Sequence, residues 1–250
     1  MWPLAGLHWL TPQWPAPVNV QALTTLRGVV AENDPYSGFN LAHHVSDDLQ
    51  GVQRNRVHLQ CALGLTQVQW LDQVHGIDVA DAIGDERIRC ADAVYTTQKS
   101  LACAVLAADC LPVIFCNRQG TEIAVAHAGW RGLCAGVLEN TVRRFESLPS
   151  QLMAWLGPAI GSHSFEVGPE VREAFFASTP LLRDALASCF SARTTGDRLL
   201  ANLYALARLR LAAVGVDSVF GGDFCTLTDA RFYSWRRGAV TGRQATLVVM

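Results

Sequence analysis

Lysine is almost absent from this chain, because Lys99 is its only lysine among 250 residues. Arginine supplies the other positive charges, and 22 acidic against 20 basic residues leave a net charge of −2. Binding to a nucleic-acid backbone requires clustered Lys and Arg, so we expect no nucleic-acid partner. The arginine bias suits fixed recognition of carboxylate or phosphate groups, although a GC-rich genome would produce the same bias.

The sequence also lacks an apolar run of the roughly 20 residues that a membrane-spanning helix needs, so we expect no membrane partner. The segment 1–17 is rich in proline and has no basic region, which predicts neither a signal peptide nor a transit peptide. The eight cysteines form no CxxC pair. We therefore expect reduced thiols and a cytoplasmic protein.

Strand-like and helical stretches alternate along the chain, which predicts an α/β domain. No repeat or linker divides the sequence, so residues 1–250 are expected to form a single domain. Fully apolar strands imply a sheet covered on both faces. Strands are expected at 19–25, 68–76, 121–127, 152–156, 217–222 and 244–250, with two more within 101–117, and helices at 47–61, 132–147, 169–176 and 198–214.

Polar side chains stand where three apolar stretches end. His75 precedes a glycine in QVHG, Asp109 and Cys110 follow the first apolar run of 101–117, and His127 ends the strand TEIAVAH. One thiolate and two imidazoles fit a catalytic zinc site, in which three protein ligands leave the fourth position to water. A bound metal ion would lower the pKa of that water to about 7.

These residues also have ordinary interpretations. A histidine at a strand end is more often a hydrogen-bonded structural residue, and Cys110 is one of eight cysteines. The spacing of 35 residues from His75 to Cys110 and 17 to His127 matches no short zinc motif. A metal-free alternative makes Cys110 the nucleophile and His127 its base, supported by Asp109.

The turn after His127 contains Trp130 and Arg131 between glycines. Free backbone N–H groups at the start of the following helix, together with the Arg131 guanidinium, would form an anion site. Trp130 either offers a flat surface on which a base could stack or packs its ring over the hydrophobic core.

Several motifs together resemble the YfiH/YlmD family, whose members are described as purine nucleoside phosphorylases, laccase-domain polyphenol oxidases or peptidoglycan editing factors. The resemblance runs from residue 12 to the C-terminus and is most specific over 107–139. The motifs are QVHG (73–76), AADCLPV (107–113), AHAGWRGLCAG (126–136), WLGPAIG (155–161), FEVG (165–168), FGGDFCT (220–226), FYSWRR (232–237) and TGR (241–243). In that family the matching His, Cys and His bind a metal, which implies His75, Cys110 and His127 as ligands here.

The resemblance implies an α/β (α+β) fold with layers in the order α-β-β-α, mixed sheets and a likeness to cysteine-hydrolase domains. It implies phosphorolysis of adenosine, inosine and methylthioadenosine, with adenosine deamination as a side activity. The alternatives are an amidase that removes L-serine from UDP-MurNAc-L-Ser and a copper-dependent laccase. Zinc is the expected ion and Cu²⁺ the alternative, but seven histidines without a His-X-His pair argue against a multicopper centre.

Further roles follow from this resemblance. His75, Cys110 and His127 would be catalytic as well as metal ligands, and Asp109 would protonate the departing purine or orient a histidine ligand. The Arg131 guanidinium and Trp130 would bind phosphate and substrate.

Departures from the family pattern occur in two loops, at 25–33 and 40–48. The first keeps Arg27 without a Gly-Gly turn and the second begins at Asn40; both residues are expected to bind substrate or phosphate, with an altered substrate range. Asn202 replaces an expected aspartate and is interpreted as structural. The expected partners are small molecules, and the chain is expected to be a monomer or a weak dimer. A scaffold protein in which the three candidate ligands merely pack is the non-enzymatic alternative.

Overall fold

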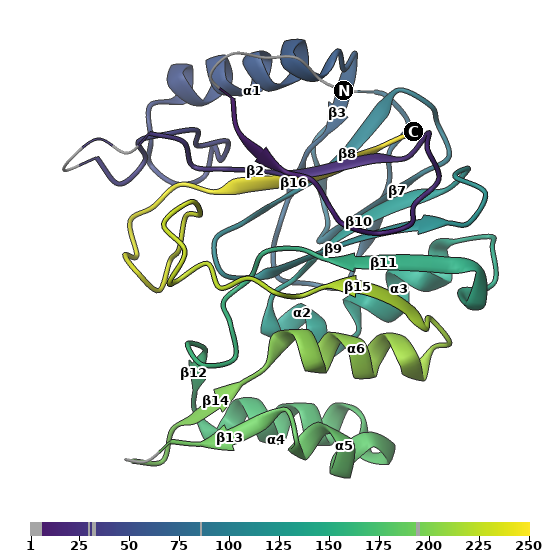
Figure 1. The fold of residues 1–250 in the computed structure, drawn as a ribbon, viewed down its shortest axis with the longest axis vertical. Coiled ribbons are helices and arrows are strands. Elements are labelled where there is room, and N and C mark those ends of the chain that lie inside the picture. Colours follow the sequence, from purple (N-terminus) through teal and green to yellow (C-terminus); the bar gives the residue numbers. More distant parts are fainter. Residues whose placement is uncertain (1–6, 30, 32–33, 86, 194–195) are drawn as a thin grey trace.

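The computed structural model describes residues 7–29, 31, 34–85, 87–193 and 196–250 (Figure 1). The first six residues and three positions of the 25–33 loop (Val30, Glu32 and Asn33) therefore lie outside the described residues. No helix in the described ranges is both long and apolar enough to cross a bilayer.

Two large sheets form the centre of the described structure (Figure 1). The five-stranded sheet has the order β1 (Trp9–Leu10), β2 (Gln21–Thr25), β16 (Gln244–Val249), β8 (Leu101–Ala107) and β3 (Gln67–Gln69). The six-stranded sheet has the order β15 (Ser218–Gly221), β11 (Leu152–Leu156), β9 (Leu111–Asn117), β10 (Ile123–Ala128), β7 (Ala93–Thr96) and β5 (Val79–Asp81). Parallel pairs (β3 with β8, β5 with β7, β11 with β15) occur beside antiparallel ones, so both sheets are mixed, as predicted.

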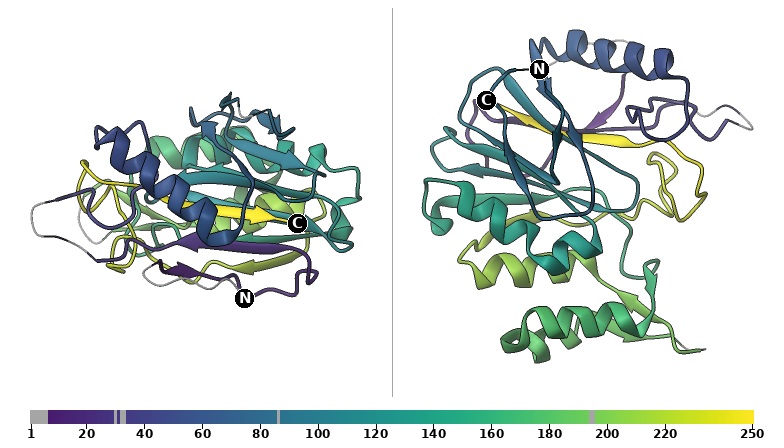
Figure 2. Two further views of the ribbon diagram at one scale, coloured as in Figure 1. Left: turned by 90° about the horizontal axis from the view of Figure 1, so that it is seen from above. Right: turned by 180° about the vertical axis from the view of Figure 1, so that it is seen from behind.

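Helices cover the outer faces of both sheets, so that the layers follow the order helix, sheet, sheet, helices (Figure 2). Helix α1 (Leu49–Leu63) packs on the five-stranded sheet. On the other side lie α2 (Trp130–Ala135), α3 (Val137–Arg144) and α6 (Leu203–Ala213), followed by α4 (Pro169–Ser178) and α5 (Arg183–Ala187). Smaller elements are β4 (Leu71–Asp72) with β6 (Arg89–Cys90), the sheet β12 (Glu166–Val167), β14 (Leu199–Ala201) and β13 (Phe190–Ala192), and two 3₁₀ turns at Pro149–Gln151 and Pro180–Leu182.

Three apolar clusters fill the spaces between these layers. The middle cluster joins the two sheets through residues such as Val105, Ile114 and Val125, all fully buried. The other two clusters lie between α1 and the five-stranded sheet and between the six-stranded sheet and its helices. Strands β8, β9 and β10 are buried along their whole length, which explains why they are apolar on both faces.

The structure corrects three predicted elements. The helix expected at 198–214 begins only at Leu203, because residues 199–201 pair with β12 and β13 as strand β14. The helix expected at 132–147 is divided at Gly136, whose φ of 109° is left-handed. The strand expected at 68–76 is instead two short strands, β3 and β4, which belong to different sheets and end at Asp72. Asn202 accepts a hydrogen bond from the Ala205 N–H and caps α6, in agreement with its predicted structural role.

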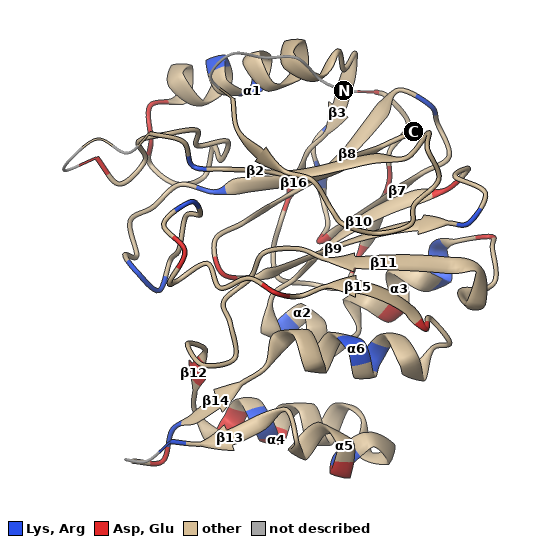
Figure 3. Ribbon diagram, in the orientation of Figure 1, with Lys and Arg blue, Asp and Glu red and all other residues tan. Residues whose placement is uncertain are grey.

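Charged residues are spread over many elements. Figure 3 shows basic and acidic positions interspersed along helices and loops of the described chain.

Candidate metal centre

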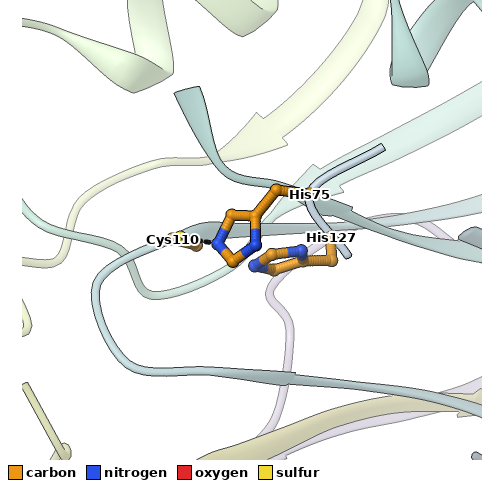
Figure 4. A group of neighbouring side chains, drawn as sticks. All are labelled: His75, Cys110 and His127. Carbon is orange, nitrogen blue, oxygen red and sulfur yellow. Dashed lines mark hydrogen bonds between the residues drawn. The ribbon is translucent and has the colours of Figure 1, made fainter. Parts of the chain in front are cut away.

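The two predicted histidines and the predicted cysteine meet in space (Figure 4). One ligand atom from each of His75, Cys110 and His127 lies within 4.8 Å of the other two. The Cys110 Sγ lies 3.9 Å from His75 Nε2, and the two imidazole centroids are 4.8 Å apart. Thiolate and imidazole are the donors that zinc prefers, and three protein ligands leave one position open. The donor set and its spacing therefore fit a single transition-metal ion.

Each ligand comes from a different segment of the chain. His75 lies in the turn after β4 with a left-handed φ of 59°, not at the end of a strand as the sequence predicts. Cys110 follows Asp109, which has a φ of 86°, in the turn that carries the chain from β8 in one sheet to β9 in the other. His127 lies within β10 and is buried. The residue types alone do not bring these side chains together; the stacking of the two sheets does.

Gly129 makes room for two of the ligands. A Cβ atom at this position would lie 2.9 Å from His75 Cδ2 and 3.0 Å from Cys110 Sγ. Contacts that short are repulsive, so any larger residue would push the ligands apart. The backbone of Gly129 has an ordinary negative φ of −58°, and its smallness is therefore required by the ligands and not by the turn.

Asp92 connects two of the three ligands, a role that we did not predict from the sequence. Its fully buried carboxylate lies just before β7. Oδ1 accepts from the His75 N–H (3.0 Å) and lies 2.8 Å from His127 Nδ1, while Oδ2 accepts from the Val74 N–H (3.1 Å) and the Gly76 N–H (2.6 Å). A carboxylate on Nδ1 leaves Nε2 of His127 as the nitrogen available to a metal. Asp92 thus fixes both the turn that carries His75 and the ring of His127.

The electrostatics of the centre favour a charged pair. Burial opposes ionisation of Cys110, but the His127 charge and hydrogen bonds from both histidines outweigh it and lower the pKa of the thiol to about 6. Burial also opposes protonation of His127, yet the Cys110 charge and the Asp92 carboxylate raise its pKa to about 9. Without a metal ion, the centre therefore holds a thiolate beside an imidazolium near neutral pH.

Asp109 is turned away from the histidines. Its Oδ1 accepts a hydrogen bond from Thr226 Oγ1 (2.6 Å) and its Oδ2 from the Arg236 N–H (2.7 Å). These bonds attach the C-terminal loops to the turn that carries Cys110. The carboxylate that orients a histidine is Asp92, although the sequence suggested Asp109 for this task.

The candidate centre opens into a cavity of about 470 Å³. Trp130 and Arg131 line it, with the Arg131 guanidinium 4.4 Å above the Trp130 ring. Apart from the ligands, Asp109 and the amide of Gln73, the other lining residues are aliphatic, aromatic or basic: His44, Leu106, Ala107, Ala108, Ile160, Phe165, Leu203, Trp235, Arg236 and Arg243. A cavity of this size and lining suits a flat small molecule that carries a polar or anionic group.

Arg27 and Asn40 do not line this cavity. The Arg27 side chain donates to the Ser37 carbonyl and lies over the Tyr233 ring. Asn40 is buried, and its Oδ1 accepts from the Arg243 N–H at 2.9 Å. Asn40 therefore holds the backbone of Arg243, a cavity residue of the TGR motif for which we predicted no role.

The fold and the site together define an α/β protein with mixed sheets and a His-Cys-His candidate metal centre at a ligand-sized cavity. A family model described as multi-copper polyphenol oxidoreductase laccase matches residues 21–250. Escherichia coli YfiH, named a purine nucleoside phosphorylase, is 50% identical over 242 residues, which cover 96% of this chain and 97% of the relative. A purine nucleoside phosphorylase of Pseudomonas aeruginosa is 48% identical over 241 residues, covering 96% of this chain and 97% of the relative.

Solved structures agree with these similarities. A Neisseria meningitidis protein of the DUF152 family superimposes with a TM-score of 0.90 at 43% identity, covering 97% of this chain and 98% of that one. YlmD from Geobacillus stearothermophilus gives a TM-score of 0.87 at 26% identity, covering 99% and 98%. The chain belongs to the YfiH/DUF152 family, and the resemblance noted in its motifs is confirmed.

Proposed function

We propose that this protein is a zinc-dependent purine nucleoside phosphorylase that acts on adenosine, inosine and methylthioadenosine. The observation that supports this proposal most is the His75–Cys110–His127 group beside a cavity with aromatic and arginine side chains. Relatives that share about half of its residues over nearly the whole chain are named purine nucleoside phosphorylases.

Different cavity residues would bind the purine and the phosphate. Trp130, Phe165 and Trp235 offer faces for a purine, and the arginines offer charge for phosphate. In phosphorolysis a phosphate oxygen forms a bond to the ribose C1′ while the C1′–N9 bond breaks, and the leaving purine takes up a proton. Both carboxylate oxygens of Asp109 already accept hydrogen bonds, which favours a positioning role for Asp109 over proton donation.

Adenosine deamination is the second activity that the centre supports. Three protein ligands with a fourth position open are the arrangement of catalytic zinc sites, and a bound ion supplies activation of water at neutral pH. Amide hydrolysis of a muramoyl-serine precursor would use the same residues. Multicopper oxidation needs further ligand clusters, and within the described residues His75, Cys110 and His127 form the one group that could hold a metal.

Purified protein with its metal content measured tests the proposal. We expect phosphate-dependent conversion of inosine to hypoxanthine and ribose 1-phosphate, and a loss of about 100-fold or more in His75→Ala and His127→Ala together with their metal. His163→Ala, an exposed histidine that does not line the cavity, is the matched control. Equal turnover in the ligand variants and the parent would contradict the assignment.

The alternatives are separated in the same preparation. UDP-MurNAc-L-Ser and a phenolic substrate are assayed beside inosine and adenosine. Turnover of the muramoyl compound without nucleoside turnover would identify an amidase, and oxidation of the phenol that depends on added copper would identify a polyphenol oxidase.

A further inference from the structure

The cavity beside the candidate metal centre has an excess of positive charge. Arg131, Arg236 and Arg243 all line it, and Asp109 is the one carboxylate among the described lining residues. Both oxygens of Asp109 are occupied by Thr226 and by a backbone N–H. No ion pair involves any of the three arginines in the described part of the chain. A partly enclosed charge without a partner favours an anionic ligand.

Two of these arginines are engaged elsewhere. Arg131 is exposed and packs over the Trp130 ring. Arg236 is exposed as well, and both of its terminal nitrogens donate to the Glu166 carbonyl at 3.2 Å. They therefore contribute positive charge at the rim and have less capacity for a specific contact inside the cavity.

Arg243 differs from the other two because it is only partly exposed and because hydrogen bonds hold its backbone N–H and its Nη1. Its backbone N–H donates to Asn40 Oδ1, and its Nη1 donates to the carbonyls of Thr241 (2.8 Å) and Gly242 (3.0 Å). Among the described residues nothing accepts from its Nε or Nη2. The side chain is thus oriented in advance while part of its donor fork stays free.

Arg243 lines the same cavity as the three metal ligands. A Cβ atom on Gly242 would lie 2.7 Å from the Tyr233 ring, so only glycine lets the chain pass this buried tyrosine. Burial lowers the pKa of Arg243, while the charges of Cys110 and Asp109 act in the opposite direction. Arginine keeps its charge in such surroundings.

We infer that Arg243 binds the phosphate substrate and holds it beside the metal centre, with Arg131 and Arg236 at the rim. The inference rests on the proposed function, and it moves the main phosphate contact from Arg131, as the sequence suggested, to Arg243. Nε and Nη2 of one guanidinium match two oxygens of a phosphate in a bidentate contact. One of the remaining oxygens would then be free to form the bond to C1′ as the C1′–N9 bond breaks, and the phosphate proton would pass to the purine.

Direct binding of inorganic phosphate to the zinc-loaded protein tests this assignment by calorimetry. We expect Arg243→Gln to weaken phosphate binding at least about tenfold and Arg243→Lys to weaken it less, because lysine keeps the charge but not the fork. Arg143→Gln, an exposed arginine of α3 outside the cavity, should bind as the parent does. Zinc content and melting temperature verify that each variant is folded and loaded.

Steady-state kinetics supply the second measurement. In Arg243→Gln the KM for phosphate should rise at least about tenfold, while the KM for inosine stays within about twofold. Unchanged phosphate affinity in both Arg243 variants, or an equal rise in both KM values, would overturn the inference. If the parent binds phosphate through Arg243 yet consumes no inosine, the proposed function fails and the phosphate site stands.

Discussion

Replacing Asp92 by asparagine removes one oxygen from a carboxylate that serves four partners. Oδ1 contacts the His75 N–H and His127 Nδ1, and Oδ2 contacts the N–H groups of Val74 and Gly76. Every partner presents a donor to a carboxylate, so the amide NH₂ of asparagine must face two donors in either orientation. Two charge-assisted hydrogen bonds are lost whichever way the amide turns.

The magnitude follows from these two bonds. Hydrogen bonds to charged groups contribute about 1.5–3 kcal/mol each, so we expect the variant to lose about 3 kcal/mol or more of unfolding free energy. Since the same bonds hold the His75 turn and the His127 ring, zinc affinity should fall by about 10–100-fold. Chelator competition measures the affinity, and urea denaturation measures the stability.

Asp78→Asn is the matched control, because Asp78 is exposed and lies directly before β5, as Asp92 lies directly before its partner strand β7. It makes the same change of charge without touching a ligand. Zinc affinity in Asp92→Asn within about twofold of the parent, whatever its stability, would show that Asp92 does not organise the centre.

Two further predictions concern the ligands themselves. Gly129→Ala should weaken zinc binding at least about tenfold, because the added methyl group would meet His75 and Cys110. The melting temperature should be nearly unchanged, because alanine fits the negative φ of this position. Normal zinc affinity in a chelator competition would argue against that steric role. The second prediction is pH-dependent zinc affinity. Between a Cys110 pKa of about 6 and a His127 pKa of about 9, the metal-free centre keeps its proton on His127, which zinc must displace. Affinity measured from pH 7 to 8.5 should therefore rise about tenfold per pH unit, and a flat profile would refute the charged pair.

The strands were the most predictable part of the fold. The runs 101–107, 111–117 and 152–156 are apolar on both faces, and the structure buries each of them completely. Gly136 shows the limit of periodicity, since apolar positions continue at helical spacing across it while its left-handed φ separates α2 from α3. Likewise, 199–201 fits a helical pattern, but β12 and β13 supply partners that a local pattern cannot contain.

The candidate site was predictable in part. The motifs around His75, Cys110 and His127 pointed to the three ligands, whose spacing alone matched no zinc pattern. Asp92 escaped notice because its contacts depend on a turn some 17 residues away in the chain, although an aspartate directly before a buried strand is a signal worth following. Arg243 lies in the TGR motif, but only the folded chain shows that it lines the cavity and forms no ion pair among the described residues.

The turn that carries Cys110 is also the passage by which the chain leaves one sheet and enters the other. An ion bound there would cross-link this passage to the second sheet, because His127 belongs to that sheet and His75 to a loop at its side. The complete ligand set exists only when the two sheets are stacked, so a shift of one sheet against the other would weaken the binding of the ion. Occupancy of the centre would thus report on the integrity of the whole sandwich.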